Sequence, residues 1–98
     1  MSKWTFVTNH ALVLSHIHRH PLITARELSL EIGITERAIR RIIADLEAEG
    51  YIVKTKEGRR VRYIINGHLP MRHRTQKGKR VKDLLRFLAY SKNSRERK

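Results

Sequence analysis

Three arginines lie close together near the middle of the chain, at Arg37, Arg40 and Arg41. A guanidinium group presents its N–H donors as a planar fork, which can bond two acceptors at once on a carboxylate, a phosphate or a base edge. Positions three and four apart lie on one face of a helix. A helix over this stretch would therefore present the arginines together, as a surface suited to a polyanion.

A second set of candidate ligand residues consists of His16, His18 and His20. His16 and His20 have the spacing that brings two imidazoles to one side of a helix, where they could hold a zinc ion. Helical geometry turns His18 to another face, and no Asp, Glu or Cys lies nearby in the sequence. We therefore expect these histidines at the surface or near a dimer contact, and we expect no metal and no cofactor.

The arrangements that are typical of enzymes are missing from the sequence. Cysteine is absent, which excludes a disulfide framework, a thiolate metal site and a cysteine nucleophile. We also find no Gly-rich phosphate-binding loop, no activated serine and no paired carboxylates. An enzyme is therefore not expected.

The net charge of +13 is unevenly distributed along the 98 residues. Residues 1–50 contain six Lys or Arg and six Asp or Glu, whereas residues 51–98 contain sixteen and three. Such an excess predicts a polyanionic partner, and nucleic acid is a better candidate than an acidic membrane. No apolar run reaches the ~18–20 residues that span a bilayer, and the N-terminus lacks the apolar core of a signal peptide. We expect a cytoplasmic protein with no membrane contact.

Three helices are expected, each after a threonine that can accept a hydrogen bond from a backbone amide. They cover residues 9–20, 25–32 and 36–49, and the capping residues are Thr8, Thr24 and Thr35. Pro21 should end the first helix, and Gly33 and Gly50 should end the others. The aliphatic pairs of a hydrophobic staple accompany each start: Val7–Leu12, Ile23–Leu28 and Ile34–Ile39.

The third of these helices has a charge order that works against its own dipole. Its apolar positions fall on one side, at Ile39, Ile42, Ile43 and Leu46. The opposite side presents the three arginines and two small residues, Ala44 and Ala48. The arginines come early and the carboxylates of Asp45, Glu47 and Glu49 come late, although a helix favours the reverse order by ~0.3–1 kcal/mol per charge. This order indicates a helix that enters the major groove of DNA by its N-terminal half.

The second half of the chain alternates as a β-hairpin and then ends in an amphipathic helix. The expected strands cover residues 51–57 and 60–65, with Gly58 and Arg59 near the turn. Ile52, Val61, Tyr63 and Ile65 should face the core, and Lys54, Lys56, Arg60 and Arg62 should point outward. A basic loop over residues 68–79 precedes a helix over about residues 80–90, and the tail 91–98 should fray. We expect Trp4 and Phe6 to pack on the domain or on a second subunit.

The phrase GITERAIRRIIADLEAEGYI, at residues 33–52, resembles the third helix and first wing strand of the multiple-antibiotic-resistance-regulator (MarR) family. Ser29, Gly33 and Ile39 also match the small residue, glycine and aliphatic residue of the general helix-turn-helix pattern, with serine in place of the usual alanine. The resemblance covers roughly residues 8–66. It implies an α+β, mainly α fold, in which residues 1–66 form a winged helix-turn-helix domain and residues 67–98 a basic loop, a helix and a tail.

The resemblance also implies a sequence-specific transcriptional regulator that binds double-stranded DNA as a homodimer. The DNA-binding residues would be Thr35, Glu36, Arg37, Arg40, Arg41, Lys54, Lys56, Arg59, Arg60 and Arg62, with further phosphate contacts from the cluster at 72–80. Dimer contacts would come from Leu12, Val81, Leu84, Leu85 and Leu88, although the last helix could instead pack on its own domain. The short chain leaves little room for a ligand pocket, so no small-molecule effector is expected. The alternatives are an RNA-binding winged helix and a winged helix that serves as a protein-interaction adaptor.

Overall fold

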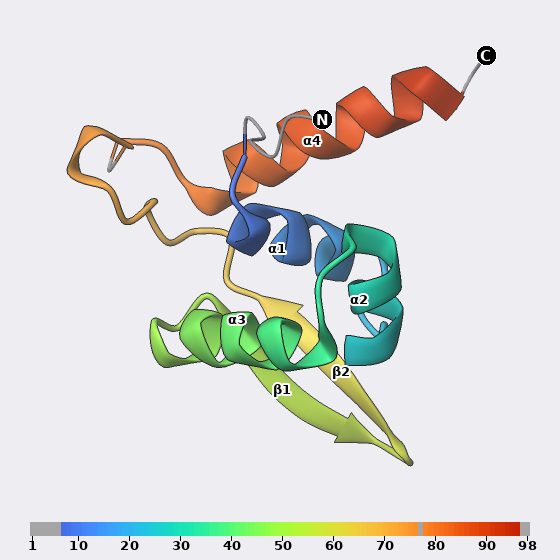
Figure 1. Ribbon diagram of the computed structural model, residues 1–98. Helices are drawn as coiled ribbons and strands as arrows, with labels where there is room; N and C mark the ends of the chain where they lie inside the picture. The colour runs from blue at the N-terminus through green and yellow to red at the C-terminus, as the bar shows by residue number, and fades with distance from the viewer. Residues whose placement is uncertain (1–6, 77, 97–98) are drawn as a thin grey trace.

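The computed structural model describes residues 7–76 and 78–96, with side chains described as far as residue 88. In chain order the elements are α1 (Asn9–Arg19), α2 (Ala25–Ile32), α3 (Glu36–Ala48), β1 (Ile52–Glu57), β2 (Arg60–Ile65), the short 3₁₀ turn η1 (Arg74–Gln76) and α4 (Val81–Glu96). Figure 1 shows α1 in the middle and α2 at its right, with α3 and the hairpin below and α4 above. The expected α+β, mainly helical fold is confirmed.

The three expected helix starts are confirmed by their capping bonds. The hydroxyl of Thr8 accepts from the amide of Ala11 at 3.1 Å, and that of Thr35 accepts from the amide of Ala38 at 3.0 Å. Thr24 and Glu27 form a reciprocal capping box. These side chains satisfy amides that have no partner within the helix, so local sequence determines where each helix begins.

The core lies between the elements that surround α1. Val13, Leu14 and Ile17 of α1 are buried. The opposing residues come from every neighbouring element: Leu28 of α2, Ile39, Ile42, Ile43 and Leu46 of α3, Tyr51 and Ile52 at the start of the hairpin, and Val81 and Leu85 of α4. The apolar face expected for the third helix is thus confirmed, and the opposite face of α3 is left to solvent.

The hairpin has the expected turn, and Gly58 adopts a positive φ of 63° there. Its register places Lys54 opposite Tyr63 and Lys56 opposite Val61. Directly opposed residues share a face of the sheet, so both lysines lie on the face that carries the core residues Tyr63 and Ile65. The four cations that were expected to point outward therefore lie on two faces of the hairpin. Lys54 and Lys56 share the face of Tyr63 but are exposed. Arg60 and Arg62 occupy the other face, where Arg60 is exposed and Arg62 is half-buried.

The last helix departs from expectation in length and in packing. It runs to Glu96, beyond the expected end near Tyr90. Val81 and Leu85 are only 4% and 1% exposed and belong to the same core as α1. Tyr51 ties the preceding loop to the hairpin by donating to the carbonyl of Pro70 at 2.7 Å. The beginning of this loop and the first turns of α4 therefore pack on the domain itself.

The expected packing of Trp4 and Phe6 concerns residues that lie outside the described part of the chain. In the described part of the chain, no helix is both long and apolar enough to cross a bilayer.

Candidate nucleic-acid interface

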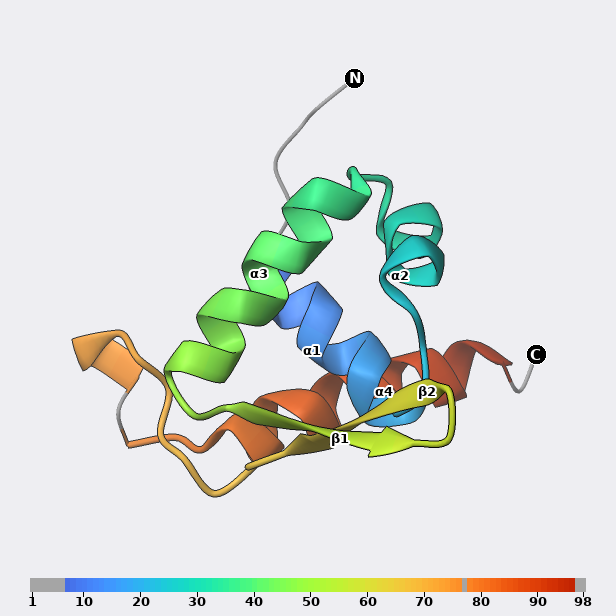
Figure 2. The same ribbon diagram turned by 90° about the horizontal axis from the view of Figure 1, so that it is seen from below.

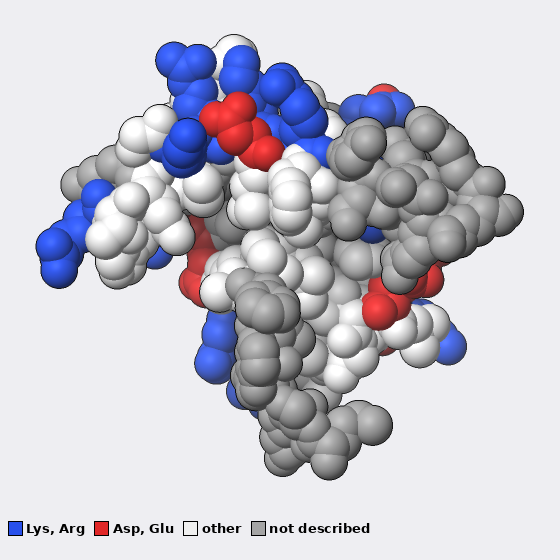
Figure 3. Space-filling view, turned by 90° about the horizontal axis from the view of Figure 1, so that it is seen from above, with Lys and Arg blue, Asp and Glu red and all other residues white. Residues whose placement is uncertain are grey.

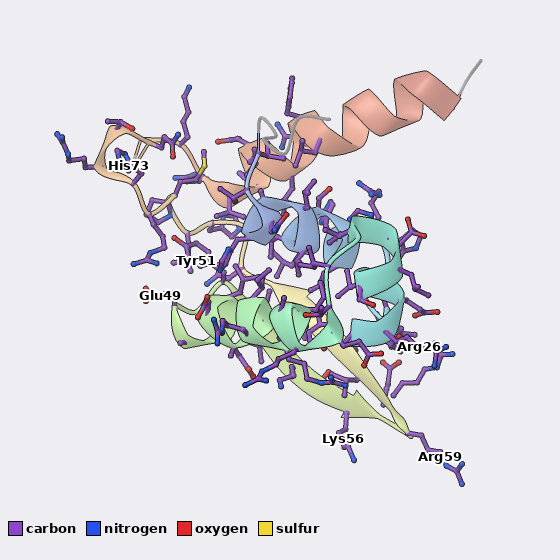
Figure 4. All side chains as sticks on the ribbon, in the orientation of Figure 1. Arg26, Glu49, Tyr51, Lys56, Arg59 and His73 are labelled. Carbon is purple, nitrogen blue, oxygen red and sulfur yellow. The ribbon has the colours of Figure 1, made fainter. Side chains whose placement is uncertain are left out.

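The outward face of α3 brings the three arginines of the sequence prediction together. Arg37, Arg40 and Arg41 are all exposed, and Ala44 and Ala48 continue the same side of the helix as small, exposed residues. Figure 4 shows this face directed away from α1, toward the side on which the hairpin projects. A face with long cations at one end and small side chains at the other can approach another surface closely along its whole length.

The two acidic residues late in α3 pair with side chains of neighbouring elements. Nε2 of His10, on α1, donates to Oδ2 of Asp45 at 2.9 Å. Nζ of Lys54, on β1, lies 3.5 Å from Oε1 of Glu47. These pairs hold the late carboxylates toward the body of the domain, so the negative charge of α3 is partly compensated.

The arginines of α3 differ in how far they are engaged. Nη2 of Arg40 lies 3.3 Å from Oε1 of Glu36, one turn earlier, in an exposed pair of small stabilising effect. Among the described residues, Arg37 and Arg41 make no ion pair with a carboxylate. Two guanidinium groups therefore remain available to an external anion at the beginning of the helix, where the backbone amides also favour negative charge.

The two helices of the motif are joined as the sequence predicts. Gly33 ends α2 in the left-handed conformation with φ of 86°, and its amide donates to the carbonyl of Ser29. Only glycine adopts this conformation without steric cost. Two residues later, Thr35 caps the start of α3. Figure 2 shows the resulting arrangement, with α3 crossing in front of α1 and α2 at its side.

The hairpin extends beyond the helices and places cations at its end. Figure 4 shows Arg59 at the tip and Lys56 on the same part of the hairpin, both pointing away from the domain. Arg62 is engaged differently: its Nε and Nη2 donate to the two carboxylate oxygens of Glu57 at 2.7 and 3.2 Å. These bonds lower the pKa of Glu57 and raise that of Arg62. Of the predicted cations of the hairpin, Arg62 and Lys54 thus have carboxylate partners, Glu57 and Glu47.

Tyr63 connects this hairpin to the rest of the domain. Its amide donates to the carbonyl of Pro21 at 2.9 Å. This backbone hydrogen bond joins β2 to the link that follows α1. Its side chain packs against the core, and burial raises the pKa of its hydroxyl. The hairpin is thereby tied to the core and to the link after α1.

The basic cluster at 72–80 does not join α3 and the hairpin on one face. The loop that contains it runs beside the C-terminal end of α3 and leads to α4, on the other side of the domain (Figure 1). The cluster was expected to add phosphate contacts, and its α4 end lies on the side of the domain away from the exposed face of α3. The cations of the second half are divided between two opposite surfaces.

His16 and His20 line an open groove of about 620 Å³ between α1, α2 and the hairpin. Nε2 of His16 lies 3.8 Å from Oε1 of Glu31, and His20 lines the same groove as Glu27. The fold thus brings carboxylates to histidines that have none nearby in sequence. Within the part of the chain that the structure describes, no group of three His, Cys, Asp or Glu side chains is placed to hold a metal ion.

Sequence reasoning missed several participants in these surfaces. The pairing of His10 with Asp45 and of Lys54 with Glu47 joins residues far apart in sequence, and no local pattern indicates it. Phe87 is 68% exposed on α4, outside the predicted stripe of leucines. A helical-wheel analysis of α4 would have revealed it, because it falls on the flank next to Leu84 and Leu88.

Comparison with known proteins agrees with this geometry. Residues 6–60 match the sequence profile of the MarR family, a stretch that runs through all three helices and reaches the hairpin turn. The chain belongs to the MarR family. This membership supports a winged helix whose relatives are typically DNA-binding transcription regulators, and we call the hairpin β1–β2 the wing. A search of curated proteins found no match to the chain.

Proposed function

We propose that this protein is a sequence-specific transcription regulator that binds double-stranded DNA, with α3 in the major groove and the wing on the backbone or minor groove. The observation that carries the proposal is the electrostatic division of α3. Its exposed N-terminal half presents Arg37 and Arg41 without carboxylate partners among the described residues, whereas Asp45 and Glu47 pair with other elements.

In this proposal the exposed arginines read base edges. An arginine can bond O6 and N7 of a guanine simultaneously, and a good contact of this kind contributes about 1–3 kcal/mol of discrimination between bases. Thr35 and Glu36 lie where the helix enters the groove, and the free amides there can bind a phosphate. The cations of the wing, at Lys54, Lys56, Arg59 and Arg60, add contacts that position the protein but do not select a sequence.

We further propose a homodimer in which the exposed flank of α4 meets a second copy. Phe87 is strongly exposed, and Leu12, Leu84 and Leu88 are half-buried. Val81 and Leu85, which were expected at the same contact, are buried in the core of their own subunit and are therefore removed from it. Two recognition helices related by a two-fold axis would read a palindromic site.

Selection of bound sequences from a random duplex pool tests the main proposal. The wild-type protein is expected to enrich a palindromic site, and the Arg37→Ala/Arg41→Ala variant is expected to lose that enrichment while keeping salt-dependent binding through the wing. A variant of equal charge, Lys56→Ala/Arg59→Ala, should weaken binding to all sequences alike. Absence of enrichment, or tighter binding to structured RNA than to duplex at the same salt, would contradict the proposal.

A further inference from the structure

A second basic surface lies at the beginning of α4. It consists of Lys79, Arg80, Lys82 and Arg86, which we call the α4 basic surface. Three of these residues are exposed, and Lys82 is half-buried. Figure 3 shows Lys and Arg side chains gathered over the start of α4 around a small acidic group, beside uncharged surface.

The α4 basic surface faces away from the proposed DNA-reading face. Val81 and Leu85 point into the core toward α1, so Lys82 and Arg86, each one position further along, are turned aside from it. Figures 1 and 2 both show α4 and α3 on opposite sides of α1. The domain measures 36 × 31 × 28 Å. A straight duplex lying on α3 and the wing therefore does not reach α4.

The four cations of this surface outnumber the one acidic residue that lies among them in the sequence. Asp83 is the acidic residue among them, and its carboxylate accepts from the backbone amide of Arg80 at 3.1 Å, which caps the helix. None of the four cations makes an ion pair with a carboxylate in the described parts of the chain. Like charges at i and i+4, such as Lys82 and Arg86, destabilise a helix. An external polyanion bound at this surface would reduce the repulsion between these cations. Its neutralised phosphates would also release the counterions that had been condensed on them.

We propose that the α4 basic surface binds the phosphate backbone of a second duplex DNA segment, so that one subunit holds two segments on opposite faces. A duplex is the polyanion that the proposed function already brings to the protein, and binding of one segment raises the local concentration of its neighbours. The inference rests on that function for the first segment only. The second contact neutralises phosphates and reads no bases.

Capture of a second duplex tests the inference. Protein is bound to a duplex immobilised on beads, and retention of a fluorescent duplex of unrelated sequence is measured over a range of salt. Compared with wild type, the full-length Lys82→Gln/Arg86→Gln variant is expected to bind a single duplex within about twofold, to retain the second duplex about tenfold less well, and to show a salt slope of capture smaller by about 2.

The matched control removes the same charge from the wing. Lys56→Gln/Arg59→Gln is expected to weaken the first contact, and its retention of the second duplex should be normal once the beads are loaded to the same protein level. Both variants need an unchanged helical circular dichroism signal. A photo-crosslinker at position 86 is expected to label the second duplex in the wild-type background.

The outcomes separate the two proposals. If Lys82→Gln/Arg86→Gln captures the second duplex as well as wild type, bridging arises from two α3 faces of a dimer and the inference is overturned. Capture of acidic vesicles or RNA by this surface in place of duplex would overturn it as well. If instead Arg37→Ala/Arg41→Ala binds and selects duplex like wild type, the proposed function of α3 fails, while crosslinking from position 86 still reports on α4.

Discussion

Arg59 and Arg62 carry the same charge on the same hairpin, but their surroundings differ. Arg59 projects from the tip of the wing (Figure 4). Arg62 is held by two hydrogen bonds to Glu57. An exposed cation that neutralises one phosphate contributes about 1 to the log–log salt slope of binding. A cation that is already paired releases fewer counterions when it meets DNA, because its charge is compensated beforehand.

We therefore expect Arg59→Ala to reduce the salt slope of duplex binding by about 1, and Arg62→Ala to reduce it clearly less. Glu57→Gln is the complementary change, since it releases Arg62 and should make the slope steeper. Fluorescence anisotropy at several salt concentrations measures all three variants. If Arg59→Ala and Arg62→Ala reduced the salt slope equally, the ion pair between Arg62 and Glu57 would have to break when DNA binds.

At the scale of the element, α2 depends on a charged cap. Oε1 of Glu27 accepts from the amide of Thr24 at 2.9 Å and from its hydroxyl at 3.2 Å. These bonds, the backbone bond first, hold the pKa of Glu27 below its ordinary value of 4.5. A carboxylate with a lowered folded pKa stabilises the fold above its unfolded pKa, and this contribution is lost as the pH falls through the folded pKa.

Glu27→Gln is accordingly expected to lower the thermal midpoint at neutral pH, because the neutral amide is a weaker acceptor. The difference from wild type should shrink as the pH falls below about 4.5, where the wild-type carboxylate becomes protonated. Thermal unfolding followed from neutral to acid pH measures the effect. Glu31→Gln removes a charge from the same helix without touching the cap. A gap between wild type and Glu27→Gln that stays constant into acid would rule out this explanation.

The packing of α4 matters at the scale of the whole molecule. Leu85, at 1% exposed, connects α4 to α1, whereas Phe87, at 68% exposed, lies on the outer flank. Replacing a buried leucine by alanine removes contacts and leaves a cavity, at a cost of about 2–5 kcal/mol. Replacing an exposed side chain changes the stability of a subunit by only about 0.5 kcal/mol. The two positions therefore separate folding from association.

Leu85→Ala is expected to lose about 2–5 kcal/mol of unfolding free energy. Phe87→Ser should leave the unfolding of the subunit nearly unchanged and shift the monomer–dimer equilibrium toward monomer. Chemical denaturation and sedimentation equilibrium measure the two quantities. If Leu85→Ala only shifted the oligomeric state, α4 would belong to the interface rather than to the core.

Local residues of the sequence determined most of the elements of this protein. Threonine caps and glycine stops act within one turn of the backbone, so the bounds of α2 and the starts of α1 and α3 follow from neighbours alone. The arginine face of α3 follows as well, because helical period is a local property. Membership of the MarR family agrees with both.

Only the tertiary structure decided how these elements share charge. His10 meets Asp45 and Lys54 meets Glu47 because α1 and β1 pack beside α3, and the register of the hairpin puts Lys54 and Lys56 on the same face as Tyr63. The same packing buries Val81 and Leu85 and turns the cations of α4 away from the recognition helix. Composition shows which charges the chain carries, and helical period shows which face of an element carries them. The distance between two charges depends on contacts between segments that are remote in sequence.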